Sequence, residues 1–313
     1  MKVILDCDPG HDDAVAIILA ASGISPLEIV GITTVAGNVQ VEKNTLNALK
    51  VCDVIGLDHV PVVQGATRPL VKEAEIAEEI HGETGLDGPQ LPNEPSRQAI
   101  DQHAVDFIIE KLLQADEPIT LVPTGPLTNI ALALVKEPKI KQNIQEIVLM
   151  GGGTFGNWTP AAEFNIYVDA EAAKIVFESG IPVRMFGLDV THQVLATTET
   201  VDALRKMGNP VSGFVSDLLT FFIQAYQDHF DFPGGPIHDA CTIIHLIDPD
   251  IFTFEHVHVA IETNGEHTYG MTVVDRLGVT GQEPNTYFAT TLDHEKFWSV
   301  FKEAMVSYGE RSE

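Results

Sequence analysis

Short apolar runs alternate with longer stretches of helical spacing along this chain, and the alternation predicts its secondary structure. The first run, residues 3–5, is continuously apolar, which is typical of a strand buried on both faces of a parallel sheet. A Pro-Gly pair ends it, and Asp12 and Asp13 lead directly into a helix. Further strands are predicted at 27–34, 61–63, 119–122, 147–150 and 183–188, with two sheet-edge strands at 257–261 and 272–274. Further helices are predicted at 41–55, 71–80, 99–114, 169–179, 197–225, 241–247 and 293–307, and one starts at 130–135.

The regular alternation of strands and helices determines the expected fold class. It predicts an α/β protein with an open, mainly parallel sheet flanked by helices. The 313 residues allow one large domain or two modest ones, and the 44% hydrophobic content supports a substantial core. Because no internal repeat, low-complexity tract or evident linker interrupts the chain, we expect a single domain over residues 1–313.

Four carboxylates collect where the first strand ends and the first helix begins. They are Asp6, Asp8, Asp12 and Asp13. Asp6 and Asp8 are two residues apart and are expected to point to the same side of the strand. Asp12 and Asp13 fall in the first helical turn, where the helix dipole favours their ionised form. The end of a strand at the start of a helix is the place where open α/β sheets bind ligands.

The density of charge distinguishes this loop from an ordinary helix cap. A single Asp before a helix is usually a cap, but four close carboxylates repel one another unless a cation, a proton or a ligand offsets their charge. All-oxygen ligands without a paired Cys or His favour a hard ion, Ca²⁺ or Mg²⁺, over zinc. His11, alone in this loop, is expected to be solvated. The stretch therefore predicts a metal site.

Other strand ends carry polar groups that could share the same crevice. Asn38 follows the strand at 27–34, and Thr124 follows the strand at 119–122, where its backbone carbonyl suits a hard cation. Ordinary turn chemistry also explains either residue. A triple glycine at 151–153 lets the backbone approach a ligand closely, but it does not match the dinucleotide-binding pattern.

Later segments carry further candidate side chains. His81 opens a loop with three glycines in seven residues, where it either reaches a pocket mouth or is solvated. If their segment is extended, Glu163 and Asn165 project to one side, and together with Asn157 they suit a polyol such as ribose. The adjacent His238 and Asp239 follow a Gly/Pro-rich loop and open a helix. Such a pair is either structural or part of a site.

The composition and net charge of the chain limit the kinds of binding partner and the cellular location that we expect. The chain has 18 Lys and Arg against 45 Asp and Glu, and this formal charge of −27 argues against DNA, RNA and anionic membranes as partners. No apolar run approaches the ~20 residues of a membrane span. The N-terminus lacks the long apolar region of a signal peptide, and the three Cys have no CxxC spacing, so we expect a cytoplasmic protein with reduced thiols.

Residues 6–14, DCDPGHDDA, resemble the N-terminal signature of the nucleoside hydrolases, which cleave the N-glycosidic bond of free nucleosides. The resemblance extends over essentially the whole chain, through TGPLTN at 124–129, MGGG at 150–153, AEFN at 162–165 and PIHD at 236–239. The segments at 81–89 and 234–239 are most similar to bacterial pyrimidine-preferring members. The resemblance implies an open α/β fold, one tightly held Ca²⁺ and a homotetramer.

The resemblance also implies roles for individual residues. The Ca²⁺ ligands would be Asp8, Asp13, the Thr124 carbonyl and Asp239. The ribose would be bound by Asp12, Asn38, Asn157, Glu163 and Asn165, with His81 and His238 near the base. Asp8 would act as general base on the attacking water. His238 would protonate the departing base, since an unperturbed histidine pKa of about 6.5 lies near working pH.

The sequence alone leaves open which base is preferred, and it is compatible with two other functions. The helix before His238 offers Tyr226, Gln227, His229 and Phe230 as base contacts, and activity on both inosine and uridine is the alternative to pyrimidine preference. A phosphohydrolase would also use a strand-end Asp-x-Asp motif, but the presumed site segments contain no Lys or Arg for a phosphate. The remaining rival is a non-catalytic protein that binds Ca²⁺ or a nucleoside.

Overall fold

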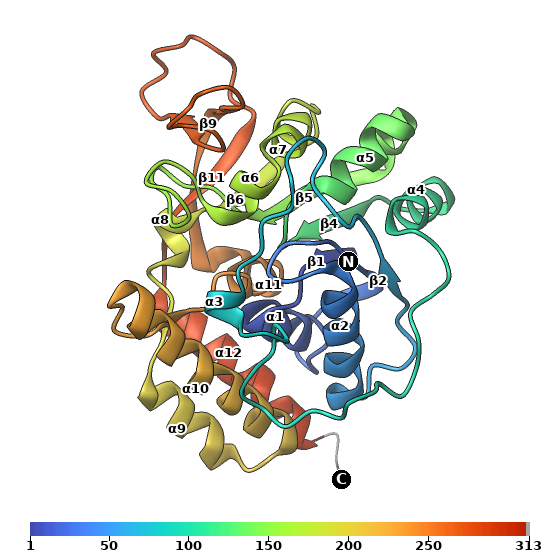
Figure 1. Ribbon diagram of the computed structural model, residues 1–313, viewed down its shortest axis with the longest axis vertical. Coiled ribbons are helices and arrows are strands. Elements are labelled where there is room, and N and C mark those ends of the chain that lie inside the picture. Colours follow the sequence, from blue (N-terminus) through green and yellow to red (C-terminus); the bar gives the residue numbers. More distant parts are fainter. Residues whose placement is uncertain (311–313) are drawn as a thin grey trace.

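The computed structural model describes residues 1–310, which are built around one large sheet (Figure 1). Its strands are β1 (Lys2–Cys7), β2 (Glu28–Thr34), β3 (Val62–Gln64), β4 (Ile119–Pro123), β5 (Ile144–Met150), β6 (Val183–Phe186), β9 (Phe252–Ile261), β10 (Thr272–Asp275) and β11 (Thr286–Leu292). Their order in space is β10-β9-β11-β6-β5-β4-β1-β2-β3. All neighbours pair in parallel except β9, which is antiparallel to β10 and β11. A separate antiparallel pair joins β7 (Leu195–Ala196) to β8 (Gly235–Pro236).

Helices cover both faces of the sheet, which confirms the predicted fold class. They are α1 (His11–Ala20), α2 (Val41–Ile55), α3 (Glu78–His81), α4 (Ala104–Gln114), α5 (Thr128–Lys136), α6 (Phe164–Val168), α7 (Ala170–Phe177), α8 (Leu188–Thr191), α9 (Thr198–Met207), α10 (Pro210–Phe230), α11 (Ala240–Ile247) and α12 (His294–Glu310). Alternate residues of β1 face two separate cores. Val3 and Leu5 pack with α1, α10, α11 and α12, whereas Ile4 packs with α4, α5 and α7. Burial on both faces explains why this strand is apolar throughout.

The strand order creates a crevice at the centre of the sheet. The chain runs outward from β1 through β2 to β3 on one side, and from β4 through β5 to β6 on the other. The carboxyl ends of β1 and β4 therefore flank a switch point, the usual ligand site of an open α/β sheet. Asp8 follows β1 and Thr124 follows β4, so both belong to this crevice.

Several predicted element boundaries were wrong. The helix predicted at 71–80 is reduced to α3. The backbone N–H of Ala77, directly before α3, donates to the Asn38 carbonyl instead of to a helical partner. The helix predicted from residue 99 starts at Ala104, and the His103 side chain caps it. The segment 197–225 contains two helices, because Gly208 takes a left-handed φ of 74° and ends α9.

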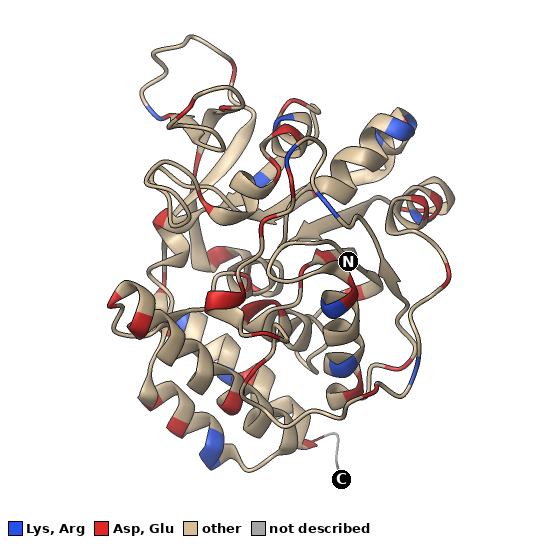
Figure 2. Cartoon of the chain, in the orientation of Figure 1, with Lys and Arg blue, Asp and Glu red and all other residues tan. Residues whose placement is uncertain are grey.

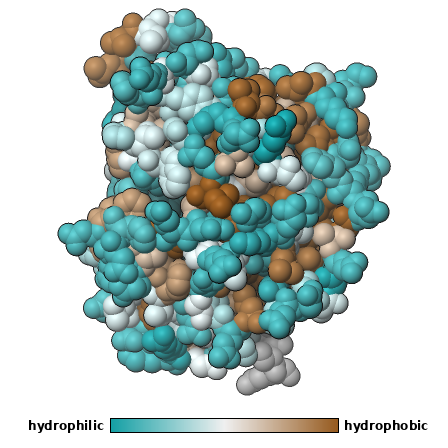
Figure 3. Space-filling view, viewed as in Figure 1, coloured by the Kyte–Doolittle hydropathy of each residue, from teal (hydrophilic) through white to brown (hydrophobic). Residues whose placement is uncertain are grey.

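The predicted sheet edge was also only half right. Strand β10 is an edge strand, but β9 lies between β10 and β11, and the sequence reading missed β11. Hydrophilic residues predominate on the face shown in Figure 3, with separate hydrophobic patches among them. Within residues 1–310, none of the helices combines the length and the apolar character needed to cross a membrane.

His245 of α11 is expected to make the fold acid-sensitive. Its ring is buried against Phe186 and Phe254, and among residues 1–310 its Nδ1 has no hydrogen-bond partner. Burial, helped by nearby Arg184, lowers its pKa to about 4. The unfolded chain takes up this proton below a pKa of about 6.5, so the stability that neutral His245 contributes is lost as pH falls from 6.5 toward 4.

This pH effect can be measured with a matched aromatic replacement. Between pH 8 and pH 5 the wild type should lose about 2 kcal/mol more unfolding free energy than His245→Phe, at 1.36 kcal/mol per pKa unit. Guanidinium unfolding at both pH values measures the difference. Equal losses in the two proteins would show that His245 is not the acid-sensitive group.

Candidate active site

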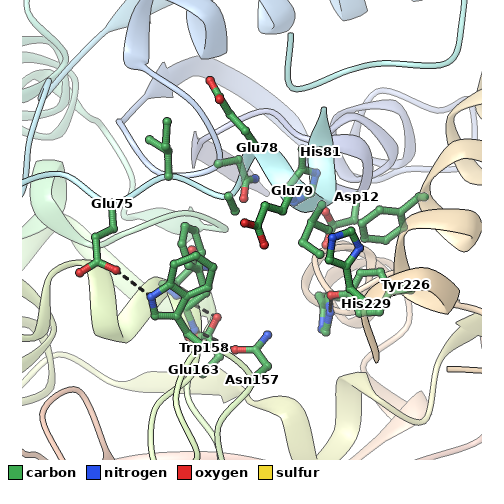
Figure 4. Close-up of a pocket in the computed structure, with 18 of the residues that line it drawn as sticks. Asp12, Glu75, Glu78, Glu79, His81, Asn157, Trp158, Glu163, Tyr226 and His229 are labelled. Carbon is green, nitrogen blue, oxygen red and sulfur yellow. Dashed lines mark hydrogen bonds between the residues drawn. The ribbon is translucent and has the colours of Figure 1, made fainter. Parts of the chain in front are cut away.

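A cavity of about 880 Å³ opens at the carboxyl ends of the central strands (Figure 4). Most of the predicted site residues line it, namely Asp12, Asn38, His81, Thr124, Asn157, Glu163, Asn165, His238 and Asp239. Asp8 and Asp13 lie one layer deeper, hydrogen-bonded to the lining residues Asn38 and Thr124. Residues from several loops and helices that are far apart in the sequence thus meet in one place.

The floor of the cavity is acidic. Asp12, Asp13 and Asp239 have carboxylate oxygens within 4.8 Å of one another, and all three side chains are buried. Asp8 accepts a hydrogen bond from the Asn38 backbone N–H at 2.7 Å through Oδ2, while its buried Oδ1 has no hydrogen-bond partner in the described part of the chain. We refer to these four carboxylates as the acidic floor. Figure 2 shows acidic residues at the centre of the molecule as well as on its outer helices.

Burial makes the acidic floor costly to ionise. It raises the pKa of Asp12 to about 8, with neighbouring Asp13 adding to the effect. It raises the pKa of Asp8, Asp13 and Asp239 as well. A bound cation would offset this cost. The unpartnered Asp8 oxygen and the all-oxygen donor set fit a hard divalent ion.

Asp6 lies apart from the acidic floor. Its carboxylate accepts hydrogen bonds from Thr33 Oγ1 at 2.6 Å and from Asn129 Nδ2 at 2.8 Å. Strand β1 ends at Cys7, so the strand alternation that was expected to align Asp6 with Asp8 does not extend to Asp8. The Asp6 backbone carbonyl nevertheless supports the site, because it accepts from Thr124 N at 2.9 Å.

One wall of the cavity presents an amide and a carboxylate from the start of α6. Glu163 caps this helix by accepting from the backbone N–H groups of Asn165 and Ile166. The extended segment predicted here is therefore wrong, although both side chains do line the cavity. Asn165 Nδ2 donates to the Thr124 carbonyl at 2.7 Å, and the second lone pair of that carbonyl remains for a cation. Burial raises the pKa of Glu163 to about 7.

The opposite wall carries histidines and aromatic rings. His238 Nδ1 lies 2.8 Å from Thr191 Oγ1, and its Nε2 lies 2.9 Å from the Tyr226 hydroxyl. Burial lowers the His238 pKa well below 6.5, so the assumption of an unperturbed pKa was wrong. This shift favours the neutral form of the imidazole. Sequence spacing gave no sign of Thr191, which is 47 residues away.

His11 and His81 form a buried pair beside this wall. Their rings stack with centroids 5.5 Å apart, and His11 Nε2 lies 2.8 Å from the Asp87 carbonyl. His11 is thus not solvated, and burial lowers its pKa to about 4. His81 ends α3 rather than opening a flexible loop, and its ring also stacks on Phe222. Burial lowers the His81 pKa too.

The aromatic lining was only partly predicted. Tyr226, His229 and Phe230 line the cavity, whereas Gln227 does not. The sequence did not predict that five further residues line the cavity, namely Phe222, Trp158, Phe164, Met150 and Ile80. A usable signal existed for Phe222, because Phe222, Tyr226 and Phe230 recur every four residues and share one helix face.

Comparisons with known proteins agree with this site. Residues 3–299 match the model of the inosine-uridine preferring nucleoside hydrolase family. This chain belongs to that family. It is 50% identical to the pyrimidine-specific ribonucleoside hydrolase RihA of Shewanella woodyi, with 98% of each chain covered, and 46% identical to RihA of Escherichia coli O81, with 98% and 99% covered.

Solved structures confirm the fold. The purine-preferring ribonucleoside hydrolase from Gardnerella vaginalis is 36% identical and superimposes with a TM-score of 0.92, covering 99% of this chain and all of its own. The plant nucleoside hydrolase PpNRh1 is 32% identical with a TM-score of 0.91, covering 97% and 98%. Membership of this family makes the protein an N-ribohydrolase. Among the described residues, none of those that line the cavity is Lys or Arg, which disfavours a substrate that carries a phosphate.

Proposed function

We propose that this nucleoside hydrolase is Ca²⁺-dependent and cleaves free pyrimidine ribonucleosides, uridine and cytidine, into ribose and base. The observation that carries the proposal is that one cavity combines three features. They are the acidic floor, a polar wall with Glu163 and Asn165, and an aromatic wall with His238 and Tyr226. Pyrimidine preference is supported by the name of the RihA relatives at 46–50% identity, whereas the purine-preferring relative is only 36% identical.

The polar wall and the acidic floor together suit a ribose. Asp12, Asn38, Asn157, Glu163 and Asn165 supply carboxylate and amide groups, which pair with sugar hydroxyls as acceptors and donors. Fixing the sugar in one orientation aligns its anomeric carbon for attack. Carboxylates close to the sugar also stabilise the positive charge of an oxocarbenium-like transition state.

Asp8 is the proposed general base. Its Oδ1 is buried beneath the lining residues and makes no hydrogen bond to any of residues 1–310, so it can accept a proton from water. Asp8, Asp13, the Thr124 carbonyl and Asp239 would hold Ca²⁺ at the floor. Bound there, the ion would supply positive charge that lowers the pKa of water and orients sugar hydroxyls.

His238 is the proposed donor to the departing base, and His81 lies near the base. The His238 ring is held by Thr191 and Tyr226, so its orientation is set before substrate enters. Negative charge that develops on the base favours the protonated imidazole, since a nearby opposite charge raises a histidine pKa. A pKa that burial lowers before substrate enters is compatible with that role.

Release of reducing sugar tests the proposed function. We expect ribose from uridine and cytidine, faster than from inosine and adenosine, and loss of activity after dialysis against a chelator. Readdition of Ca²⁺ should restore the rate, because all proposed ligands are hard oxygens. Comparable rates on inosine would indicate broad inosine-uridine specificity, and full activity after chelation would contradict the metal requirement. No ribose from any nucleoside would leave a non-catalytic binder or, if a phosphomonoester is cleaved, a phosphohydrolase.

A further inference from the structure

One wall of the cavity, residues 74–81, has few backbone anchors of its own. Before this wall, Leu70 N donates to the Asp169 carboxylate at 2.9 Å, and within it Ala77 N donates to the Asn38 carbonyl at 2.9 Å. Between these two anchors, the hydrogen bonds and ion pairs found within residues 1–310 are made by the side chains of Lys72 and Glu75. The position of residues 71–76, which lead into α3, therefore depends on these two side chains.

Glu75 connects this part of the chain to the loop before α6, which carries Trp158. Its Oε1 lies 3.2 Å from Lys72 Nζ, and its Oε2 accepts a hydrogen bond from Trp158 Nε1 at 2.8 Å. Figure 4 shows this bond at the rim, with the Trp158 ring beside the cavity. The indole packs edge-on against Phe164, with ring centroids 4.9 Å apart. We call Lys72, Glu75 and Trp158 the rim tether.

The far end of the rim tether is held by two tyrosines. Lys72 Nζ lies 3.6 Å from the ring centroid of Tyr167 and 4.7 Å from that of Tyr269. The two rings contact each other edge-to-face, and the Tyr269 hydroxyl donates to Glu171 at 2.6 Å. An ammonium shared by two rings and a carboxylate is more restrained than one in an isolated surface ion pair.

From these contacts we infer that Glu75 is a positioning residue for substrate binding. Through Trp158 and Lys72 it holds residues 71–76, which lead into the helix that carries Ile80 and His81, against the loop that carries Asn157 and the indole. The inference rests on the proposed function, since it concerns the same cavity. The acidic floor belongs to the loop after β1, to α1 and to the residue before α11, and it lies outside the rim tether. Loss of the tether should therefore weaken substrate binding and leave the chemical step almost unchanged.

Steady-state kinetics on uridine test the rim tether. We expect Glu75→Ala to raise KM about tenfold with kcat within about twofold of the wild type. Trp158→Phe keeps the ring against Phe164 but removes the N–H, and should raise KM similarly. The double variant should be no worse than either single one, because both remove the same link. Glu75→Gln keeps an oxygen acceptor for the indole and should recover most of the loss. Glu73→Ala, exposed in the same segment and outside the cavity, is the matched control.

The outcomes separate the tether from the proposed function. An unchanged KM in Glu75→Ala, or additive losses in the double variant, would overturn the tether. If the wild type cleaves no nucleoside, the proposed function fails, and Trp158 fluorescence then decides about the tether in a Trp298→Phe background. Glu75→Ala should shift the Trp158 emission to longer wavelength as the indole becomes more solvated, while Glu73→Ala should not. An unshifted emission would overturn the inference without any turnover.

Discussion

Asp8→Asn is expected to lower kcat for uridine by about 10³-fold or more, the upper part of the range for loss of a general base. The amide keeps an oxygen that can accept from Asn38 N, as Oδ2 does in the wild type. It cannot accept a proton from water at the position of Oδ1, and it weakens one ligand of the proposed Ca²⁺ site. Ribose release at saturating uridine measures the effect.

Asp6→Asn is the matched control for this prediction. Asp6 lies two residues before Asp8, in β1, but its carboxylate faces Thr33 and Asn129, and an amide oxygen can still accept from both. Its kcat should stay within about tenfold of the wild type, the cost of one weakened hydrogen bond. Equal losses in the two variants would mean that charge near β1, and not the role of Asp8, determines the rate. Circular dichroism and thermal unfolding confirm that both variants fold.

The parts of the site that could be predicted from sequence are those that topology brings together. Parallel strands place their carboxyl ends at one edge of the sheet, so Asp8, Asn38 and Thr124 were expected to share a crevice once the strands were located. The continuous apolar run of β1 identified it as a strand covered on both faces, because such a strand is apolar throughout. Most site candidates followed from this one rule of α/β architecture.

The parts that could not be predicted depend on packing between distant segments. Whether His238 is solvated or buried is decided by α10 and α8, which place Tyr226 and Thr191 against its two nitrogens. Its lowered pKa is a property of that packing and not of the motif around it. The link between Glu75 and Trp158 spans 83 residues and has no sequence pattern.

Local signals failed where tertiary contacts compete with helix propensity. The spacing at 71–80 predicts an acidic helix. In the structure, Lys72 instead lies over the rings of two tyrosines and Glu75 accepts a hydrogen bond from an indole, and these contacts hold the segment in a non-helical conformation. Strand β11 was missed because its residues alternate only weakly between apolar and polar. Both failures lie outside the switch point, so they left the predicted floor of the site unchanged.

His238→Ala is expected to separate natural from activated substrates. Uridine needs a proton on its departing base, so kcat should fall by about 10²–10³-fold when the donor is lost. A riboside of 4-nitrophenol leaves without that help, and its kcat should fall by less than about tenfold. The burial of His238 against Tyr226 and Thr191 means that truncation also opens a small void, so thermal unfolding is measured alongside.

His229→Ala provides the comparison within the same cavity. His229 lines the cavity, but its Nδ1 lies 2.9 Å from the Ala225 carbonyl of its own helix. Any effect of this variant on the shape of the cavity should change both substrates alike, leaving the ratio of their kcat values near that of the wild type. If His238→Ala also changes both rates equally, its role is to shape the cavity, and the proton must reach the base from another group. A large change in the ratio for His238→Ala alone assigns the donor to this imidazole, because only the leaving-group step distinguishes the two substrates.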